Sequence, residues 1–156
     1  MRLRVLAVGS KMPEWVEQGV ADYTRRMPRE FSVEWLDVSL AKRGTGSADS
    51  YRRQEAESIQ SKLNHDEDLI VLDVQGMEIS TEKIADRFAE WQMEGRRACV
   101  VIGGPDGLHQ SVLSRAAEQW SFGRITLPHT LVRVILAEQL YRAWSLQRGH
   151  PYHRAN

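Results

Sequence analysis

The sequence has one cysteine in 156 residues, no excess of either charge and no long apolar segment. A single cysteine excludes an intrachain disulfide and a cysteine-cluster metal site, and Cys99 lies in an apolar run (98–102) that favours a buried structural thiol. Twenty-one Lys and Arg balance 21 Asp and Glu, which argues against a protein that coats nucleic acid by bulk charge. Because no stretch approaches the ~20 apolar residues that span a bilayer, we expect no membrane association and a cytoplasmic location.

The composition that is present is ordinary for a globular protein, with 42% hydrophobic and 27% charged residues. The length suits one domain, which we expect to cover residues 1–156. The charges are unevenly distributed: residues 66–94 carry nine acidic side chains against Lys83 and Arg87, whereas the chain from Arg124 onward has five arginines against Glu138 alone. Such a basic end either presents a local phosphate-binding face or is only a solvated surface.

Short apolar runs alternate about five times with segments of helical spacing. Pro13 is suited to open the first helix, and Ser80 can cap a later one that ends at Gly95. This alternation is typical of an α/β fold with a mainly parallel sheet and helices on both faces. Strands are expected over residues 2–8, 31–38, 69–74, 98–102 and 120–126, and helices over residues 13–27, 49–64, 80–95, 112–117 and 131–147.

In parallel α/β sheets, ligands bind at the carboxyl ends of the strands. Three loops are therefore candidates: one after Leu72, one at Gly103 and one around Leu127. The second loop is rich in glycine, which lets a ligand approach the backbone, but it matches neither the P-loop nor the dinucleotide-binding spacing and is alternatively a plain turn. In the third loop, backbone groups of residues 122–127 could face a heterocycle such as adenine, while His129 is either part of this site, a helix cap or a solvent-facing histidine.

The last helix and the tail after it carry the remaining candidates. Arg133 and Glu138 lie at the edge of an otherwise apolar helix face, where a buried ion pair is the simplest explanation. The tail His150–Arg154 combines histidine and tyrosine, which stack on bases, with an arginine, which binds phosphate; alternatively, it is a frayed chain end. A metal site built from His129 and the two tail histidines has neither helical spacing nor acidic ligands, so no metal is expected.

Six segments carry a resemblance to a known family: Val8–Trp15, Ala41–Gly44, Ile102–Gly107, Thr126–Val134, Ala137–Ser145 and His150–Arg154. With these segments the sequence resembles the ribosomal RNA large subunit methyltransferase H family, the pseudouridine N3-methyltransferases of the SPOUT superfamily. The resemblance extends from residue 1 to about residue 154. Between Asp49 and Glu94 it lies mainly in the alternation of strands and helices.

The resemblance implies a SPOUT-type α/β fold with a C-terminal trefoil knot, which spacing and periodicity do not predict. It implies a homodimer in which the tail of one subunit completes the site of the other. It also implies S-adenosyl-L-methionine as the cofactor, bound in the knot. The residues expected to bind this cofactor are Leu72, Gly103, Gly104, Phe122, Gly123, Arg124, Ile125, Thr126 and Leu127.

The implied reaction is methylation of N3 of a pseudouridine, position 1915 in helix 69 of 23S rRNA, on the large subunit or the whole ribosome. The acceptor is an imide nitrogen that must lose its proton, so a base or an anion-stabilising charge is needed. We expect His129 to act as a base or hydrogen-bond partner and Arg154 to stabilise the anion. Tyr152 and His153 would stack on or position the target base, and Glu138 would orient one of these groups.

The RNA contacts are expected from the arginine-rich end of the chain and from Lys42 and Arg43. Because the net charge is zero, affinity for naked RNA should be weak, and a folded ribosomal surface is the expected substrate. Two alternatives stay open: a SPOUT methyltransferase acting on another RNA such as tRNA, and a non-enzymatic ribosome-assembly module. The tail sequence and the lack of a separate RNA-binding domain argue against the tRNA enzyme.

Overall fold

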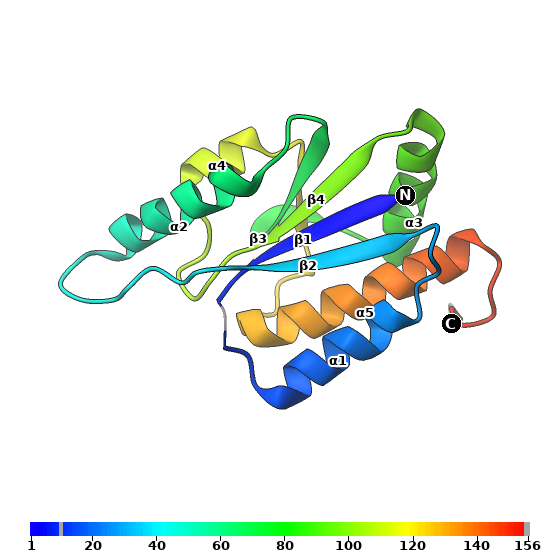
Figure 1. Ribbon diagram of the computed structural model, residues 1–156, viewed down its shortest axis with the longest axis horizontal. Helices are drawn as coiled ribbons and strands as arrows, with labels where there is room; N and C mark the ends of the chain where they lie inside the picture. Colours follow the sequence, from blue (N-terminus) through cyan, green and yellow to red (C-terminus); the bar gives the residue numbers. More distant parts are fainter. Residues whose placement is uncertain (10, 155–156) are drawn as a thin grey trace.

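The computed structural model describes residues 1–9 and 11–154; Ser10, part of one family-like segment, and residues 155–156 lie outside the described residues. The described chain contains a five-stranded sheet in the order β2-β1-β4-β3-β5, and every neighbouring pair is parallel (Figure 1). This confirms the predicted α/β fold with a parallel sheet. The strands are β1 (Arg2–Val8), β2 (Ser32–Val38), β3 (Glu67–Glu78), β4 (Arg97–Ile102) and β5 (Glu118–Ser121).

Helices cover both faces of the sheet, as predicted. Figure 1 shows α1 and α5 side by side below the sheet and α2 and α4 above it. In the same view α3 stands at the right, and it packs against α5 on the same face of the sheet. No helix in the described part of the chain is long and apolar enough to cross a membrane. The helices are α1 (Glu14–Arg25), α2 (Ala48–Lys62), α3 (Thr81–Glu94), α4 (Gln110–Arg115) and α5 (His129–Gln147).

The core is divided by the sheet into two apolar clusters. Alternate residues of β1 point to opposite faces, so that Leu3 and Val5 join the cluster under α3 and α5, whereas Leu6 joins the cluster under α2 and α4. All three side chains are fully buried, which is typical of strands covered on both faces. Cys99 is also fully buried, and burial raises the pKa of its thiol to about 12, which confirms the predicted structural role.

The helix ends follow the predicted local signals. Ser80 caps α3 by accepting a hydrogen bond from the Lys83 N–H at 3.1 Å, and Gly95 ends the helix with a left-handed φ of 65°. Pro13 occupies the position just before the first residue of α1, where the lack of an N–H costs little. Pro13 and Ser80 thus mark where α1 and α3 begin, and Gly95 marks where the chain leaves α3 toward β4.

The last strand is shorter than predicted. β5 ends at Ser121, and residues 122–128 form a loop instead of continuing the strand to residue 126. Gly123 adopts a φ of 110°, which is outside the strand region, and the pairing of β5 with β3 reaches no further than Ser121. The prediction of a strand over 120–126 was therefore wrong at its carboxyl end, and the residues concerned are free to line a cavity.

β3 is longer than predicted and comes unusually close to β5. Its pairing with β5 is irregular between Leu72 and Met77, and a Cβ added at Gly76 would lie 2.6 Å from the carbonyl oxygen of Gln119. Only glycine lets the two backbones approach this closely. Gly76 therefore holds the extension of β3 against β5, directly beside the loop that follows β5.

We expect Gly76→Ala to destabilise the fold by about 1–3 kcal/mol, because the added methyl group must push two backbones apart. Gly44→Ala is the matched control, since a Cβ at Gly44 meets no atom within 4 Å. The measurement is the free energy of unfolding in urea. Equal stability of the two variants would show that β3 and β5 do not need this contact.

Candidate active site

A cavity of about 590 Å³ lies at the carboxyl ends of β4 and β5, beside Leu72–Val74 of β3 and next to the first turn of α5. It brings together the three segments that the sequence identified as candidates, but the prediction of a loop after Leu72 was wrong, because β3 continues to Glu78 along β5. Eight of the nine residues predicted to bind the cofactor line it, and the exposed Arg124 is the exception. The lining residues are Leu72, Asp73, Val74, Ile102, Gly103, Gly104, Pro105, Gly107, Trp120, Phe122, Gly123, Ile125, Thr126, Leu127, Pro128, His129 and Val132.

Several residues of this wall were missed by sequence reasoning. Asp73 and Val74 follow Leu72 directly, so the strand-end rule already pointed to them. Val132 lies one helical turn after His129 and faces the same side of α5, a relation that helical spacing could have indicated. Trp120 belongs to β5, and only the strand register shows that it ends beside the cavity.

The glycine-rich loop is both a tight turn and part of the cavity wall. The Gly107 N–H donates to the carbonyl oxygen of Gly104 at 3.0 Å and closes the turn. A Cβ at Gly103 would lie 3.0 Å from the backbone of Gly107, and one at Gly104 would lie 3.0 Å from the side chain of Val8. The loop is thus a tight turn, and its glycines Gly103, Gly104 and Gly107 also line the cavity. The two alternatives given by the sequence, a plain turn and a ligand-binding loop, are therefore compatible.

A buried carboxylate supports this loop from behind. Glu55 on α2 is 2% exposed, and its Oε2 accepts hydrogen bonds from the Ala41 N–H at 2.9 Å and from Arg43 Nη1 at 2.8 Å. Arg43 also pairs with Asp106 in the glycine-rich loop. Arg43, predicted to contact RNA, is therefore engaged with two carboxylates, whereas Lys42 is exposed to solvent.

His129 is the first residue of α5 and lines the cavity. It is not the helix cap, because Pro128 occupies that position. Burial and the positive charge of Arg133 lower the pKa of the imidazole from its ordinary value. Both effects favour the neutral form of His129, which is able to accept a hydrogen bond or a proton.

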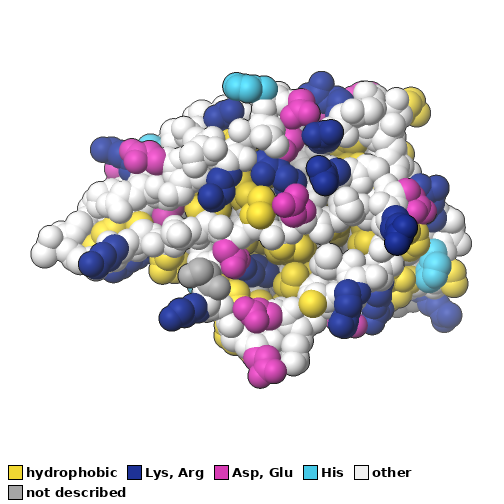
Figure 2. Space-filling view, in the orientation of Figure 1, with side chains coloured by type: hydrophobic (Ala, Val, Ile, Leu, Met, Phe, Trp, Pro, Cys, Tyr) yellow, Lys and Arg dark blue, Asp and Glu magenta, His cyan; other side chains and the backbone are white. Residues whose placement is uncertain are grey.

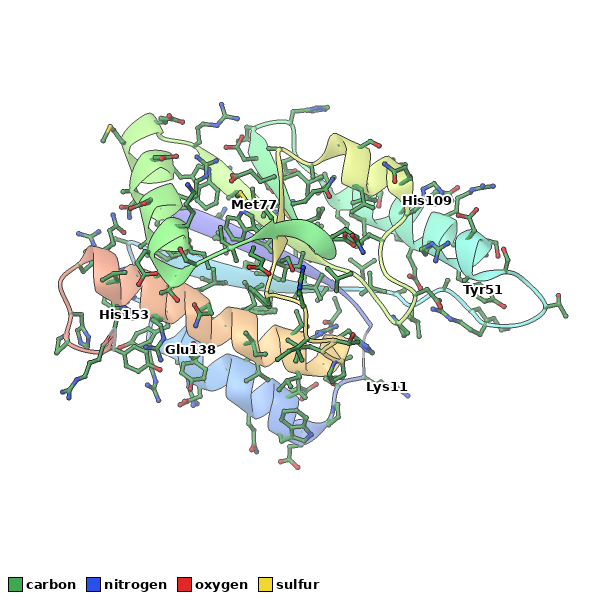
Figure 3. All side chains as sticks on the ribbon, turned by 180° about the vertical axis from the view of Figure 1, so that it is seen from behind. Lys11, Tyr51, Met77, His109, Glu138 and His153 are labelled. Carbon is green, nitrogen blue, oxygen red and sulfur yellow. The ribbon has the colours of Figure 1, made fainter. Side chains whose placement is uncertain are left out.

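Three of the other predicted catalytic side chains gather along the carboxyl-terminal half of α5. The Tyr152 hydroxyl donates to Glu138 Oε1 at 3.2 Å, and Arg142 Nε donates to the same oxygen at 2.7 Å. The Arg142 guanidinium lies 4.9 Å from the centre of the Tyr152 ring, and His153 Nδ1 is 3.4 Å from Arg142 Nη1. Figure 3 shows Glu138 and His153 together at this end. Arg142, which the catalytic prediction omitted, contacts Glu138, Tyr152 and His153. Arg154, the residue after His153, is exposed.

Tyr152 is a hydrogen-bond donor in this cluster. Burial, together with the negative charge of Glu138, raises the pKa of the phenol to about 12. At neutral pH the hydroxyl keeps its proton and donates a hydrogen bond to the Glu138 carboxylate. Tyr152 therefore does not act as a base in this cluster.

The predicted ion pair of α5 takes a different form. Glu138 pairs with Arg142 one turn further along the helix, with a nitrogen–oxygen distance of 2.6 Å. Arg133 pairs with Asp37 of β2 at 2.9 Å. Each charge is compensated as expected, but the pairing of Arg133 with a residue 96 positions away could not be seen from helical spacing.

Within one chain, the two groups of candidate residues do not meet. Glu138 lies nine residues after His129, which is about 13 Å along the helix, and the end of α5 is about 27 Å from its first turn. Figure 1 shows the tail at the end of the molecule opposite to the first turn of α5. The fold therefore collects the cofactor candidates around His129 and, separately, collects Glu138, Tyr152 and His153.

The visible surface shows no block of one charge. In the view of Figure 2, basic and acidic side chains are interspersed, with apolar side chains between them. At the cavity rim, Val74 and Ile125 are 65% and 76% exposed. Two large apolar side chains are thus exposed at the mouth of the cavity.

A family profile and several named relatives are similar to this chain. A family profile described as "Predicted SPOUT methyltransferase" matches residues 1–153. A ribosomal RNA large subunit methyltransferase H from Chromohalobacter salexigens is 49% identical over 156 residues, covering 99% of this chain and 100% of the relative. Proteins of the same name from Teredinibacter turnerae and Pseudomonas fluorescens are 48% and 45% identical with the same coverage. A solved structure of a probable methylase family protein from Haemophilus influenzae Rd KW20 matches this chain with a TM-score of 0.57 and 12% sequence identity. The match covers 98% of this chain and 70% of that one, and it shows a similarity of fold alone.

We expect Glu138→Gln to lower the pKa of Tyr152 from about 12 part of the way towards 10, because the substitution removes the negative charge and leaves the burial. The measurement is a pH titration by NMR of tyrosine labelled at Cζ, with Tyr152→Phe to assign the signal. Glu14→Gln, an exposed change on α1, is the control. An unchanged titration in Glu138→Gln would show that Glu138 does not act on the phenol.

Proposed function

This chain belongs to the ribosomal RNA large subunit methyltransferase H family of SPOUT methyltransferases, and from this membership we propose that it methylates N3 of a pseudouridine in 23S rRNA. It is an S-adenosyl-L-methionine-dependent methyltransferase of large-subunit ribosomal RNA. The observation that carries the proposal is the cavity beside Leu72–Val74 of β3 and the carboxyl ends of β4 and β5, lined by eight of the nine expected cofactor residues.

The residues of the cavity fit a nucleoside-type methyl donor. Its volume of about 590 Å³ lies within the roughly 300–1,000 Å³ of small-molecule and cofactor sites. Apolar walls at Leu72, Ile102 and Trp120 suit a flat heterocycle, and the backbone of residues 122–127 offers the donors and acceptors that read its edge. Asp73 adds one carboxylate for the polar part of the donor.

When bound, S-adenosyl-L-methionine supplies a methyl group already activated on a sulfonium sulfur. The protein must hold the acceptor nitrogen in line with that group and exclude water, and such alignment is worth roughly 7–11 kcal/mol in favourable cases. Neutral His129, at the cavity, accepts the imide proton or a hydrogen bond from the acceptor. Arg154 stabilises the negative charge that develops on the base.

The remaining tail residues position the target. Tyr152 and His153 present aromatic faces for stacking, and Glu138 orients Tyr152 by accepting its hydroxyl proton in a hydrogen bond. Arg142 holds the same carboxylate and lies over the Tyr152 ring. The tail thus reaches the substrate as a preassembled unit, with little rotamer entropy left to lose on binding.

The active enzyme in this proposal is a homodimer. The tail of a chain lies at the far end of α5, about 27 Å along the helix from its own His129, so a second copy must provide the tail that faces each cavity. The exposed apolar rim at Val74 and Ile125 supports contact with another chain. Family membership also supports a trefoil knot in the carboxyl-terminal part and a single SPOUT domain over residues 1–156.

The substrate in this proposal is the pseudouridine presented by the large subunit or the whole ribosome, in the cytoplasm. Zero net charge and the interspersed charges of Figure 2 offer few phosphate contacts to naked RNA. The test is incubation of the protein with labelled S-adenosyl-L-methionine and ribosomes that lack the modification, followed by mapping of the labelled nucleoside. Label on tRNA or on another atom would overturn the assignment, and equal labelling of a short free hairpin would overturn the preference for ribosomes.

We expect His129→Ala and Arg154→Ala to be weakly active alone and to recover activity when mixed as dimers. In a mixed dimer, the cavity of the Arg154→Ala chain faces the intact tail of the His129→Ala chain, so random mixing restores about a quarter of the wild-type sites. The measurement is ribosome methylation after the two purified variants are unfolded and refolded together. Each variant refolded alone is the control, and a mixture no more active than the two controls would place the tail in its own chain's site.

A further inference from the structure

Arg133 is a buried cation that the mechanism above does not use. Its side chain is 6% exposed, and it stands in the second turn of α5. Burying a charge is costly unless charged or hydrogen-bonding partners replace the water it loses. A guanidinium in this position therefore needs strong compensation from its surroundings.

That compensation comes from the carboxyl ends of two neighbouring strands. Arg133 Nη2 donates to the carbonyl oxygen of Gly9 at 2.7 Å and lies 3.3 Å and 3.4 Å from those of Val8 and Ala7. Nη1 donates to Asp37 Oδ1 at 2.9 Å. One planar group thus ties the start of α5 to β1 and to β2 at the same time.

Arg133 is not part of the cofactor cavity. With Asp37 it lines a separate cavity of about 390 Å³ between α1 and β2, whereas its neighbours Val132 and His129 line the cofactor cavity. A Cβ added at Gly9 would lie 3.5 Å from Arg133 Nη2 and 3.9 Å from His129 Nε2. The guanidinium and the imidazole therefore flank the same piece of backbone, and Gly9 leaves room for both.

We propose that Arg133 is a positioning residue for methyl transfer: its contacts with the ends of β1 and β2 fix the first turn of α5, and with it His129 and the cavity wall at Pro128. The inference rests on the proposed function, because it assigns a role inside that site. Leu127 and Pro128 lead directly into this turn, so movement of α5 also moves the wall that faces the cofactor.

The geometry of the guanidinium, and not its charge alone, carries this role. Lysine keeps the charge, but its single ammonium group cannot bridge Asp37 and the β1 carbonyl oxygens as a planar fork does. Arg133→Lys therefore separates geometry from charge. Asp37→Asn removes the negative charge of one of the two anchors and leaves the contacts with β1 in place.

The experiment compares Arg133→Lys and Asp37→Asn with Arg25→Lys, an exposed control on α1. It measures kcat and KM on unmodified ribosomes, the affinity for S-adenosylhomocysteine by calorimetry, and the imidazole NMR signals of His129. We expect Arg133→Lys to lower kcat about 10²-fold with little change in KM for ribosomes, as a displacement of about 1 Å does. The His129 signals shift and the affinity for S-adenosylhomocysteine falls, while Asp37→Asn has a smaller effect in the same direction and Arg25→Lys behaves like wild type.

Wild-type kcat and unmoved His129 signals in Arg133→Lys would overturn the proposal. If Arg133→Lys does not fold, Asp37→Ala decides, because it removes the Asp37 acceptor completely, and wild-type values for that variant overturn the proposal equally. Failure of the proposed function has a different signature. Full turnover by His129→Ala, or wild-type protein that does not label the pseudouridine, would remove the mechanism while leaving the effect of Arg133→Lys on S-adenosylhomocysteine binding intact.

Discussion

The site depends on the parallel pairing of β3 with both β4 and β5. In this register, Leu72 lies opposite Ile102 on one side and opposite Trp120 on the other, so the segment after Leu72 lies at the same level of the sheet as the loops that follow β4 and β5. Gly76 keeps β3 and β5 in contact beyond that level. Without this register, residues 72–74 of β3 and the loops at residues 103 and 122 would not enclose a common cavity.

Much of this arrangement follows from local patterns in the sequence. Near-continuous apolar runs such as 98–102 identify strands covered on both faces, and Ser80 and Gly95 mark the ends of one helix because their capping chemistry is local. The rule that ligands bind at carboxyl ends then selects the three loops that line the cavity. The cavity was therefore predictable to the level of its segments, and the resemblance to the family supplied the individual residues.

The features that could not be predicted depend on contacts between distant parts of the chain. The end of β5 is set by how far β3 accompanies it, and Gly123 turns the chain away at a point that periodicity does not mark. Arg133 finds Asp37 because β2 lies beside β1, so the ion pair needs the strand order before it can be inferred. Likewise, the cluster of Glu138, Arg142 and Tyr152 forms only because the tail folds back on the end of α5.

The central claim is that the cavity between Gly103 and Leu127 holds the methyl donor and faces the tail of a second copy of the chain. The most direct test is a crystal structure of the protein with S-adenosylhomocysteine. The account predicts the ligand between these two segments, beside His129, with Arg154 of the partner subunit reaching the open side of the cavity. A ligand bound instead in the separate cavity between α1 and β2, or a cavity faced by no tail from a second chain, would contradict it.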